Sequence, residues 1–128
     1  MEKRPVSHKV PGRTTILLVD ERDRGGLLRN LLRSSGYRVL TCTTGGLAVE
    51  ICDRLNRKID IVLTAFVLPD TDGVSLAIHL RRQYPLLNFM GMSAAPGSGD
   101  KFTAAGVPFI EKPFHYAELI ARLREYIQ

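Results

Sequence analysis

The stretch DIVLTAFVLPDTDG, residues 60–73, decides the fold of this chain. It opens with a continuous apolar run at Ile61, Val62 and Leu63 and breaks into polar residues at 70–73. A short continuous apolar run that ends in polar residues and a glycine is typical of a strand buried on both faces. We therefore expect a strand over residues 59–65 and, directly after it, a surface loop that carries function.

The same pattern repeats on both sides of this stretch. Four more short apolar runs predict strands at residues 16–19, 37–42, 87–92 and 107–110. Helical spacing of apolar residues predicts about five helices that alternate with the strands, with Leu27 and Leu47 among the residues on the apolar faces. Because right-handed crossovers return the chain to the same sheet, this alternation predicts a doubly wound α/β fold, a five-stranded parallel sheet with helices on both faces. Ligands bind such sheets outside the carboxyl ends of the strands.

Composition limits the class of protein. The 128 residues suffice for one domain, and 45% hydrophobic with 24% charged residues is ordinary for a soluble globular protein. No apolar run is long enough to span a membrane, and the first residues lack the apolar core of a signal peptide. We therefore expect a cytoplasmic protein with no membrane partner. Cys42 and Cys52 fit no zinc or redox spacing, which predicts two reduced cysteines.

The net charge of +5 is concentrated near the N-terminus. Residues 1–13 carry four basic residues against one acidic residue. A short basic segment of this kind is usually a frayed terminus, and nucleic acid is therefore not the expected partner. We divide the chain into a basic N-terminal arm, residues 1–14, and one folded domain, residues 15–128.

Four motifs stand at the predicted strand ends. Asp20 and Glu21 follow the first strand, Ser93 follows the fourth, and Lys112 comes shortly after the fifth. With the motifs ILLVDE, DIVLTAFVLPDTDG, MSA and FIEKPF in this order, the chain resembles the receiver domain of bacterial two-component response regulators over residues 15–127. The resemblance implies the CheY-like, or flavodoxin-like, form of the predicted fold and a role in phosphorelay signal transduction.

In that family an aspartate at the end of the third strand accepts a phosphoryl group, and the acidic pair after the first strand holds Mg²⁺ with it. The resemblance places Asp20 and Glu21 in the acidic pair. Lys112 and Ser93 would contact the phosphoryl oxygens, and Phe109 takes the aromatic position that responds to them. The resemblance also implies a cis peptide bond after Lys112, where a proline follows.

The acceptor position is where the chain departs from the family. The family's acceptor lies four residues before the loop proline, Pro69, and eight before the loop glycine, Gly73, which places it at Ala65. A methyl group is neither a nucleophile nor a metal ligand, so no catalytic residue is expected there. Neither Thr64, on the other face of the strand, nor Asp70 is expected to replace the acceptor.

The alanine also weakens the implied metal site. Asp20, Glu21 and the backbone carbonyl of Val67 remain as ligands once the third carboxylate and the phosphate are lost. We therefore expect at most weak Mg²⁺ binding and no other cofactor.

The segment SAAPGSGDKFTAAGV, residues 93–107, departs from the family as well. Its proline and glycines oppose helix formation, so we expect a shortened fourth helix of about two turns within residues 99–105. Family members bind partners or dimerise through the fourth helix, the last strand and the last helix. The short segment therefore indicates either altered partner recognition or a loop without consequence.

Two main classes of function follow. The first is a receiver that lacks its acceptor and is a phosphorylation-independent binding module rather than an enzyme; the alternative within this class is an ordinary phosphorylatable receiver in which Ala65 is an engineered substitution. Its partners would be signalling proteins, either a sensor kinase or a downstream effector, or a second copy bound through the last strand and last helix. The second class is a small flavodoxin-like or phosphatase-like enzyme. It lacks support, because the sequence has no glycine-rich phosphate loop and no Cys or Ser nucleophile paired with a His.

Overall fold

The computed structural model describes residues 14–55 and 58–126, and within these ranges it has five strands and five α-helices. The strands are β1 (Thr15–Val19), β2 (Arg38–Cys42), β3 (Ile61–Ala65), β4 (Asn88–Ser93) and β5 (Phe109–Glu111). The helices are α1 (Leu27–Ser34), α2 (Gly45–Leu55), α3 (Gly73–Gln83), α4 (Ser98–Ala104) and α5 (Tyr116–Tyr126). A short 3₁₀ turn at Arg24–Gly26 leads into α1. The basic arm predicted for residues 1–14 lies, apart from Thr14, outside the described residues.

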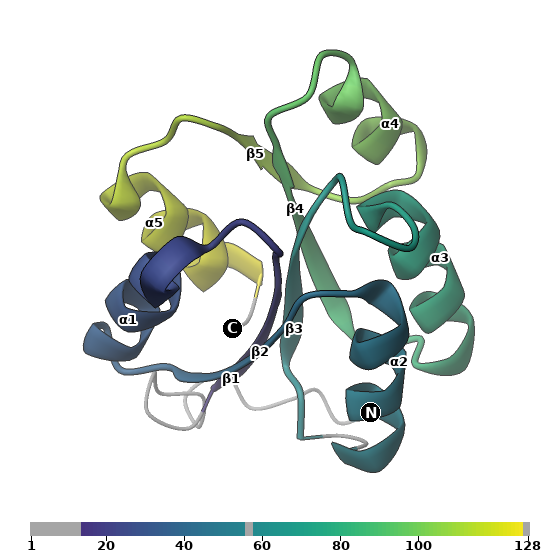
Figure 1. The fold of residues 1–128 in the computed structure, drawn as a ribbon, viewed down its shortest axis with the longest axis horizontal. Coiled ribbons are helices and arrows are strands. Elements are labelled where there is room, and N and C mark those ends of the chain that lie inside the picture. Colours follow the sequence, from purple (N-terminus) through teal and green to yellow (C-terminus); the bar gives the residue numbers. More distant parts are fainter. Residues whose placement is uncertain (1–13, 56–57, 127–128) are drawn as a thin grey trace.

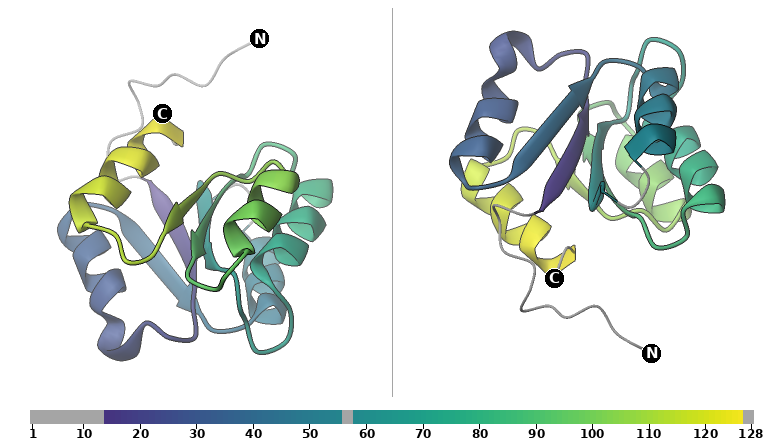
Figure 2. Two further views of the ribbon diagram at one scale, coloured as in Figure 1. Left: turned by 90° about the horizontal axis from the view of Figure 1, so that it is seen from above. Right: turned by 90° about the horizontal axis from the view of Figure 1, so that it is seen from below.

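The sheet has the predicted doubly wound architecture. Its strands are all parallel and lie in the order β2-β1-β3-β4-β5. Helices α1 and α5 cover one face, and α2, α3 and α4 cover the other (Figures 1 and 2). The strand order reverses at β1, because the chain passes from β1 to β2 on one side and then crosses to β3 on the other. The carboxyl ends of β1 and β3 therefore flank the crevice where such folds bind ligands.

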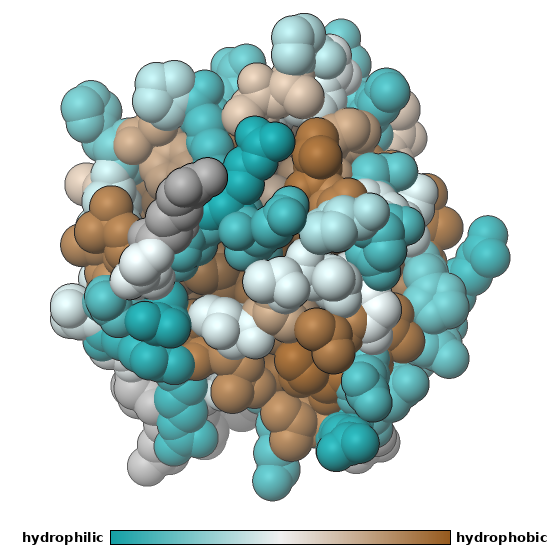
Figure 3. All heavy atoms as spheres, in the orientation of Figure 1, coloured by the Kyte–Doolittle hydropathy of each residue, from teal (hydrophilic) through white to brown (hydrophobic). Residues whose placement is uncertain are grey.

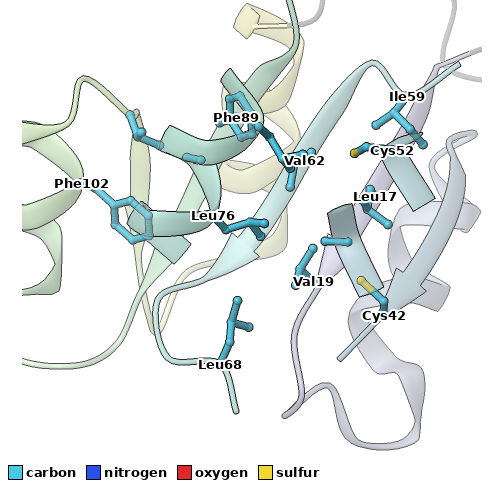
Figure 4. Close-up of a cluster of buried hydrophobic side chains, with 14 residues drawn as sticks. Leu17, Val19, Cys42, Cys52, Ile59, Val62, Leu68, Leu76, Phe89 and Phe102 are labelled. Carbon is cyan, nitrogen blue, oxygen red and sulfur yellow. The ribbon is translucent and has the colours of Figure 1, made fainter. Parts of the chain in front are cut away.

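Alternating side chains divide the core into two clusters. Ile16 and Leu18 of β1 pack under α1 and α5, whereas Leu17 and Val19 pack under α2, α3 and α4. This period of two is that of a strand buried on both faces, which explains the continuous apolar runs in the sequence. Figure 4 shows the second cluster, in which Phe102 of α4 joins residues of the central strands.

Two contacts fix the loop that connects β3 to α3. Asp72 caps α3, because its Oδ1 accepts a hydrogen bond of 2.8 Å from the backbone N–H of Ser75. Asp70 accepts one hydrogen bond of 2.9 Å from the N–H of Gly45 and another of 2.9 Å from that of Gly46, both at the start of α2. The loop is thus anchored to the helix that follows it and to a helix that precedes it in the chain.

Tyr116 fastens α5 to α1. Its hydroxyl donates to the carbonyl oxygen of Leu31 and lies 2.7 Å from the hydroxyl of Ser35. The loop between β5 and α5, which carries Lys112, is thereby held against the first helix. The peptide bond between Lys112 and Pro113 is cis, as expected.

Some details of the prediction need correction. Leu27 and Leu47, expected on buried helix faces, are 66% and 44% exposed. Leu27 is the first residue of α1, directly after Gly26, and lies at the end of the helix rather than over the sheet. The buried face of α2 runs through Gly45, Ala48 and Cys52, at intervals of three and four residues, and Leu47 lies beside it. All five predicted strands are present with bounds shifted by at most two residues.

Both cysteines are free, as predicted, and both are buried. Burial disfavours the thiolate and raises the pKa of Cys42 and of Cys52 to about 11.

Hydrophobic side chains that remain exposed are mixed with hydrophilic ones over the face shown in Figure 3. Among the described residues, no helix combines the length and the apolar character needed to cross a membrane.

Candidate functional site

The sheet register brings the predicted site residues to one edge. Val19 pairs with Thr64 between β1 and β3, so Asp20 and Ala65 follow at the same level. In the other direction Ala65 pairs with Met92, and the next residue, Ser93, pairs with Glu111 between β4 and β5. Asp20, Ala65, Ser93 and Lys112 therefore gather at the carboxyl edge, as parallel strands require.

Asp20 and Lys112 form the charged centre of this edge. Asp20 is 8% exposed, and its Oδ1 accepts a hydrogen bond of 2.8 Å from the backbone N–H of Arg22. Its Oδ2 lies 3.4 Å from Lys112 Nζ. Both carboxylate oxygens are therefore engaged within the protein, and the lysine cation offsets the cost of burying the negative charge.

Ala65 is the last residue of β3 and is partly buried. Its carbonyl oxygen accepts a hydrogen bond of 2.9 Å from the hydroxyl of Thr64, which is itself fully buried. The same carbonyl lies so close to Gly73 that a Cβ added there would be 2.4 Å from it. Glycine at position 73 thus allows α3 to begin directly against the end of β3.

Thr64 and Asp70, the two residues considered and not expected as substitute acceptors, both have hydrogen-bond partners. The Thr64 hydroxyl donates to the backbone, as described above. The Asp70 carboxylate is exposed but accepts hydrogen bonds from the backbone N–H groups of Gly45 and Gly46. These two bonds, that from Gly45 most of all, hold the pKa of the carboxyl below its ordinary value. That neither residue accepts a phosphoryl group stays a prediction.

Ser93 and Phe109 are linked to α4. Ser93 is buried and its hydroxyl is hydrogen-bonded to that of Ser98, the first residue of α4. Phe109 is half-buried, and its ring stacks on Phe102 of α4 with 6.2 Å between centroids. The predicted short helix is present as Ser98–Ala104, one residue earlier than expected.

The residues present make a poor magnesium site. Asp20 is already paired with a lysine, and Glu21 lies in an exposed turn. Val67, whose carbonyl was the third predicted ligand, is 51% exposed and forms a bridge with Asp72. In the described part of the chain, no three His, Cys, Asp or Glu residues are grouped so that they could hold a metal ion. Magnesium prefers several oxygen ligands in near-octahedral geometry, which this donor set does not supply.

A hollow adjoins the charged pair on the α1 side. Its volume is about 250 Å³, and Asp20 and Lys112 line it together with Leu27, Leu28 and Phe114.

Sequence reasoning missed two of the polar contacts that organise this edge. Ser98 binds Ser93, and Asp70 binds the start of α2. Asp70 lies 25 residues from Gly45 in the chain, a separation that no local pattern bridges. Ser98 had a local signal, since serine is common at the start of a helix, but this signal does not identify Ser93 as its hydrogen-bond partner.

Comparison with known proteins agrees with this fold and arrangement. Residues 16–124 match the response regulator receiver domain family. The chain therefore belongs to that family, whose members work in two-component signalling.

Individual relatives support the assignment. The chain is 33% identical over 125 residues to the sensor kinase CckA of Brucella abortus (strain 2308), a match that covers 91% of this chain and 13% of that protein. It is 26% identical over 118 residues to the response regulator SaeR of Staphylococcus aureus (strain USA300), covering 89% and 50%. The non-phosphorylated HemR receiver domain of Leptospira biflexa has 31% identity and a TM-score of 0.75, over 90% of this chain and 94% of that one. The chain thus spans half or less of the two full-length relatives.

Proposed function

We propose that this receiver lacks its phosphoacceptor and is a phosphorylation-independent binding module, not an enzyme. The observation that carries the proposal is alanine at residue 65, the last residue of β3, at the same sheet edge as Asp20 and Lys112. A methyl group has no lone pair with which to attack phosphorus.

The surroundings of Ala65 support the proposal. Lys112, the residue expected to contact a phosphoryl group, instead neutralises Asp20 at 3.4 Å. The hydroxyl of Ser93 is bound to Ser98. The groups that would stabilise a phosphoryl group thus have internal partners, and the edge is satisfied without one.

Magnesium enters the proposal only as a weak ligand. Asp20, Glu21 and the carbonyl of Val67 would be its protein ligands, and the pairing of Asp20 with Lys112 opposes its entry. We expect binding in the millimolar range or weaker, and no other cofactor.

We further propose that the partner is a signalling protein in the cytoplasm, either a sensor kinase or a downstream effector, and that a homodimer through β5 and α5 is the alternative assembly. The likeness to a segment of the sensor kinase CckA and to part of the response regulator SaeR supports this class of partner.

The test compares the chain with its Ala65→Asp and Ala65→Asn variants by two-dimensional NMR, each with Mg²⁺ and beryllofluoride, a mimic of the aspartyl phosphoryl group. We expect no response in the original chain or in Ala65→Asn, whose side chain has the size of aspartate without its charge. Acetyl phosphate should likewise add no phosphoryl group to the original chain, as measured by mass spectrometry.

Shifts at Ser93, Phe109 and α5 in Ala65→Asp alone would mean that only the acceptor is missing. Phosphorylation of the original chain, or a beryllofluoride response in it, would refute the proposal. If none of the three folded proteins shows chemical-shift changes with beryllofluoride, the result would agree with a module whose binding surface no longer depends on phosphorylation.

A further inference from the structure

The hydroxyl at the end of β4 already has a partner inside the protein. Ser93 and Ser98 are 5% and 1% exposed, and their Oγ atoms form a hydrogen bond. Because Ser98 is the first residue of α4, this bond joins the strand directly to the helix across the loop of residues 94–97. Figures 1 and 2 show α4 on the side of the sheet where β4 and β5 lie.

The direction of this bond follows from the number of protons available. A serine hydroxyl has one proton to donate. Ser98 Oγ donates its proton to the carbonyl oxygen of Ala95, 2.7 Å away. Ser93 is therefore the donor in the Ser93–Ser98 bond, and it has no second proton to give to the oxygen of a phosphoryl group.

The position of α4 in turn fixes the aromatic side chain on β5. Phe102 of α4 is fully buried and lies over Gly91 of β4, where an added Cβ would be 2.3 Å from the ring. Phe109 stacks on Phe102, with 17° between the ring planes. Gly99 leaves room for Phe109, since a Cβ there would come within 2.8 Å of its ring.

We propose that Ser98 is an internal partner which holds the Ser93 hydroxyl and so keeps α4 and Phe109 in one arrangement, with no phosphoryl group needed. The inference rests on the proposed function, because it explains how a receiver without an acceptor presents one constant α4–β5 surface. A second consequence is competition: any ligand that needs the Ser93 proton must first break the bond to Ser98.

The first experiment is a double-mutant cycle on the full chain with Ser93→Ala, Ser98→Ala and the double variant. Amide hydrogen exchange of α4 and the NMR resonances of Phe109 are the readouts, and melting curves establish that each variant is folded. A single hydrogen bond corresponds to about a two- to tenfold change in an opening equilibrium. We therefore expect each single variant to speed exchange in α4 by about that factor, and the double variant to add little more.

Thr103→Ala is the matched control, since it removes an exposed hydroxyl from the same helix. It should leave exchange in α4 and the Phe109 resonances unchanged. Equal exchange in Ser98→Ala and Thr103→Ala, or effects of Ser93→Ala and Ser98→Ala that simply add, would overturn the proposal.

The second experiment tests competition in the Ala65→Asp background. Adding Ser98→Ala should raise the apparent affinity for beryllofluoride with Mg²⁺ by about two- to tenfold, because the Ser93 proton becomes available. An unchanged affinity would contradict the competition. The two proposals can fail separately: a beryllofluoride response in the original chain refutes the proposed function, whereas an absence of coupling in the cycle refutes the role of Ser98.

Discussion

Lys112 Nζ lies 3.4 Å from Asp20 Oδ2, and this ion pair joins the carboxyl ends of β1 and β5, which are not neighbours in the sheet. Strands β3 and β4 lie between them, so the lysine reaches across the edge at which Ala65 ends β3. The side chain of Asp20 is 4% exposed and that of Lys112 is 33% exposed. The pair is therefore intermediate between a surface salt bridge and a fully buried one.

Removal of the lysine charge should leave Asp20 buried without a cation. For Lys112→Met, which keeps most of the apolar stem, we expect a loss of about 1–2 kcal/mol in the free energy of unfolding. Urea unfolding at neutral pH measures it, with Lys58→Met, at an exposed lysine, as the control. A loss as large in the control, or none in Lys112→Met, would show that the ion pair does not stabilise the fold.

An aspartate at position 65 should repel Asp20 when no metal is present. We expect Ala65→Asp to be less stable than Ala65→Asn by on the order of 1 kcal/mol in the presence of a chelator, because Lys112 offsets only part of the repulsion. Added Mg²⁺ should reduce this difference. Thermal melting of both variants with and without Mg²⁺ is the measurement, and an Ala65→Asp variant as stable as Ala65→Asn without metal would contradict the prediction.

The features that could be predicted from the sequence are those set by local patterns. The apolar runs gave the five strands within two residues, and the proline and glycines before residue 100 gave the short α4. The ion pair joins residues 92 positions apart. The family resemblance placed both residues at this site but did not predict the pair. The bonds of Asp70 to α2 and of Ser98 to Ser93 depend on how loops meet in space, which neither periodicity nor a motif specifies.

Asp70 should make stability depend on pH in the acid range. The N–H groups of Gly45 and Gly46 stabilise its charged form and lower its pKa from the ordinary value of 3.8. Because the pKa is lower in the folded state, the carboxylate contributes stability that is fully present above the ordinary value and is lost as the pH falls through the folded pKa.

The variant Asp70→Asn should therefore be less stable than the original chain at neutral pH. The difference should shrink as the pH falls below the ordinary value of 3.8 and the aspartate becomes protonated. Urea midpoints measured across this range provide the test, with Glu125→Gln at an exposed carboxylate on α5 as the control. A deficit that stays constant with pH would show that the charge of Asp70 is not what holds the loop to α2.

A methyl group added at Gly91 should destabilise the core. A Cβ there would lie 2.3 Å from the ring of Phe102, which is fully buried and packed against Phe66 and Phe109 and so has little room to move. We expect Gly91→Ala to cost about 1–3 kcal/mol in urea unfolding, as overpacking of a core does. Phe102→Leu alone should also destabilise, by leaving a cavity, but the double variant should lose less than the two single losses combined because the smaller side chain makes room for the methyl group. Losses that simply add would show that the strain of Gly91→Ala arises elsewhere than at Phe102.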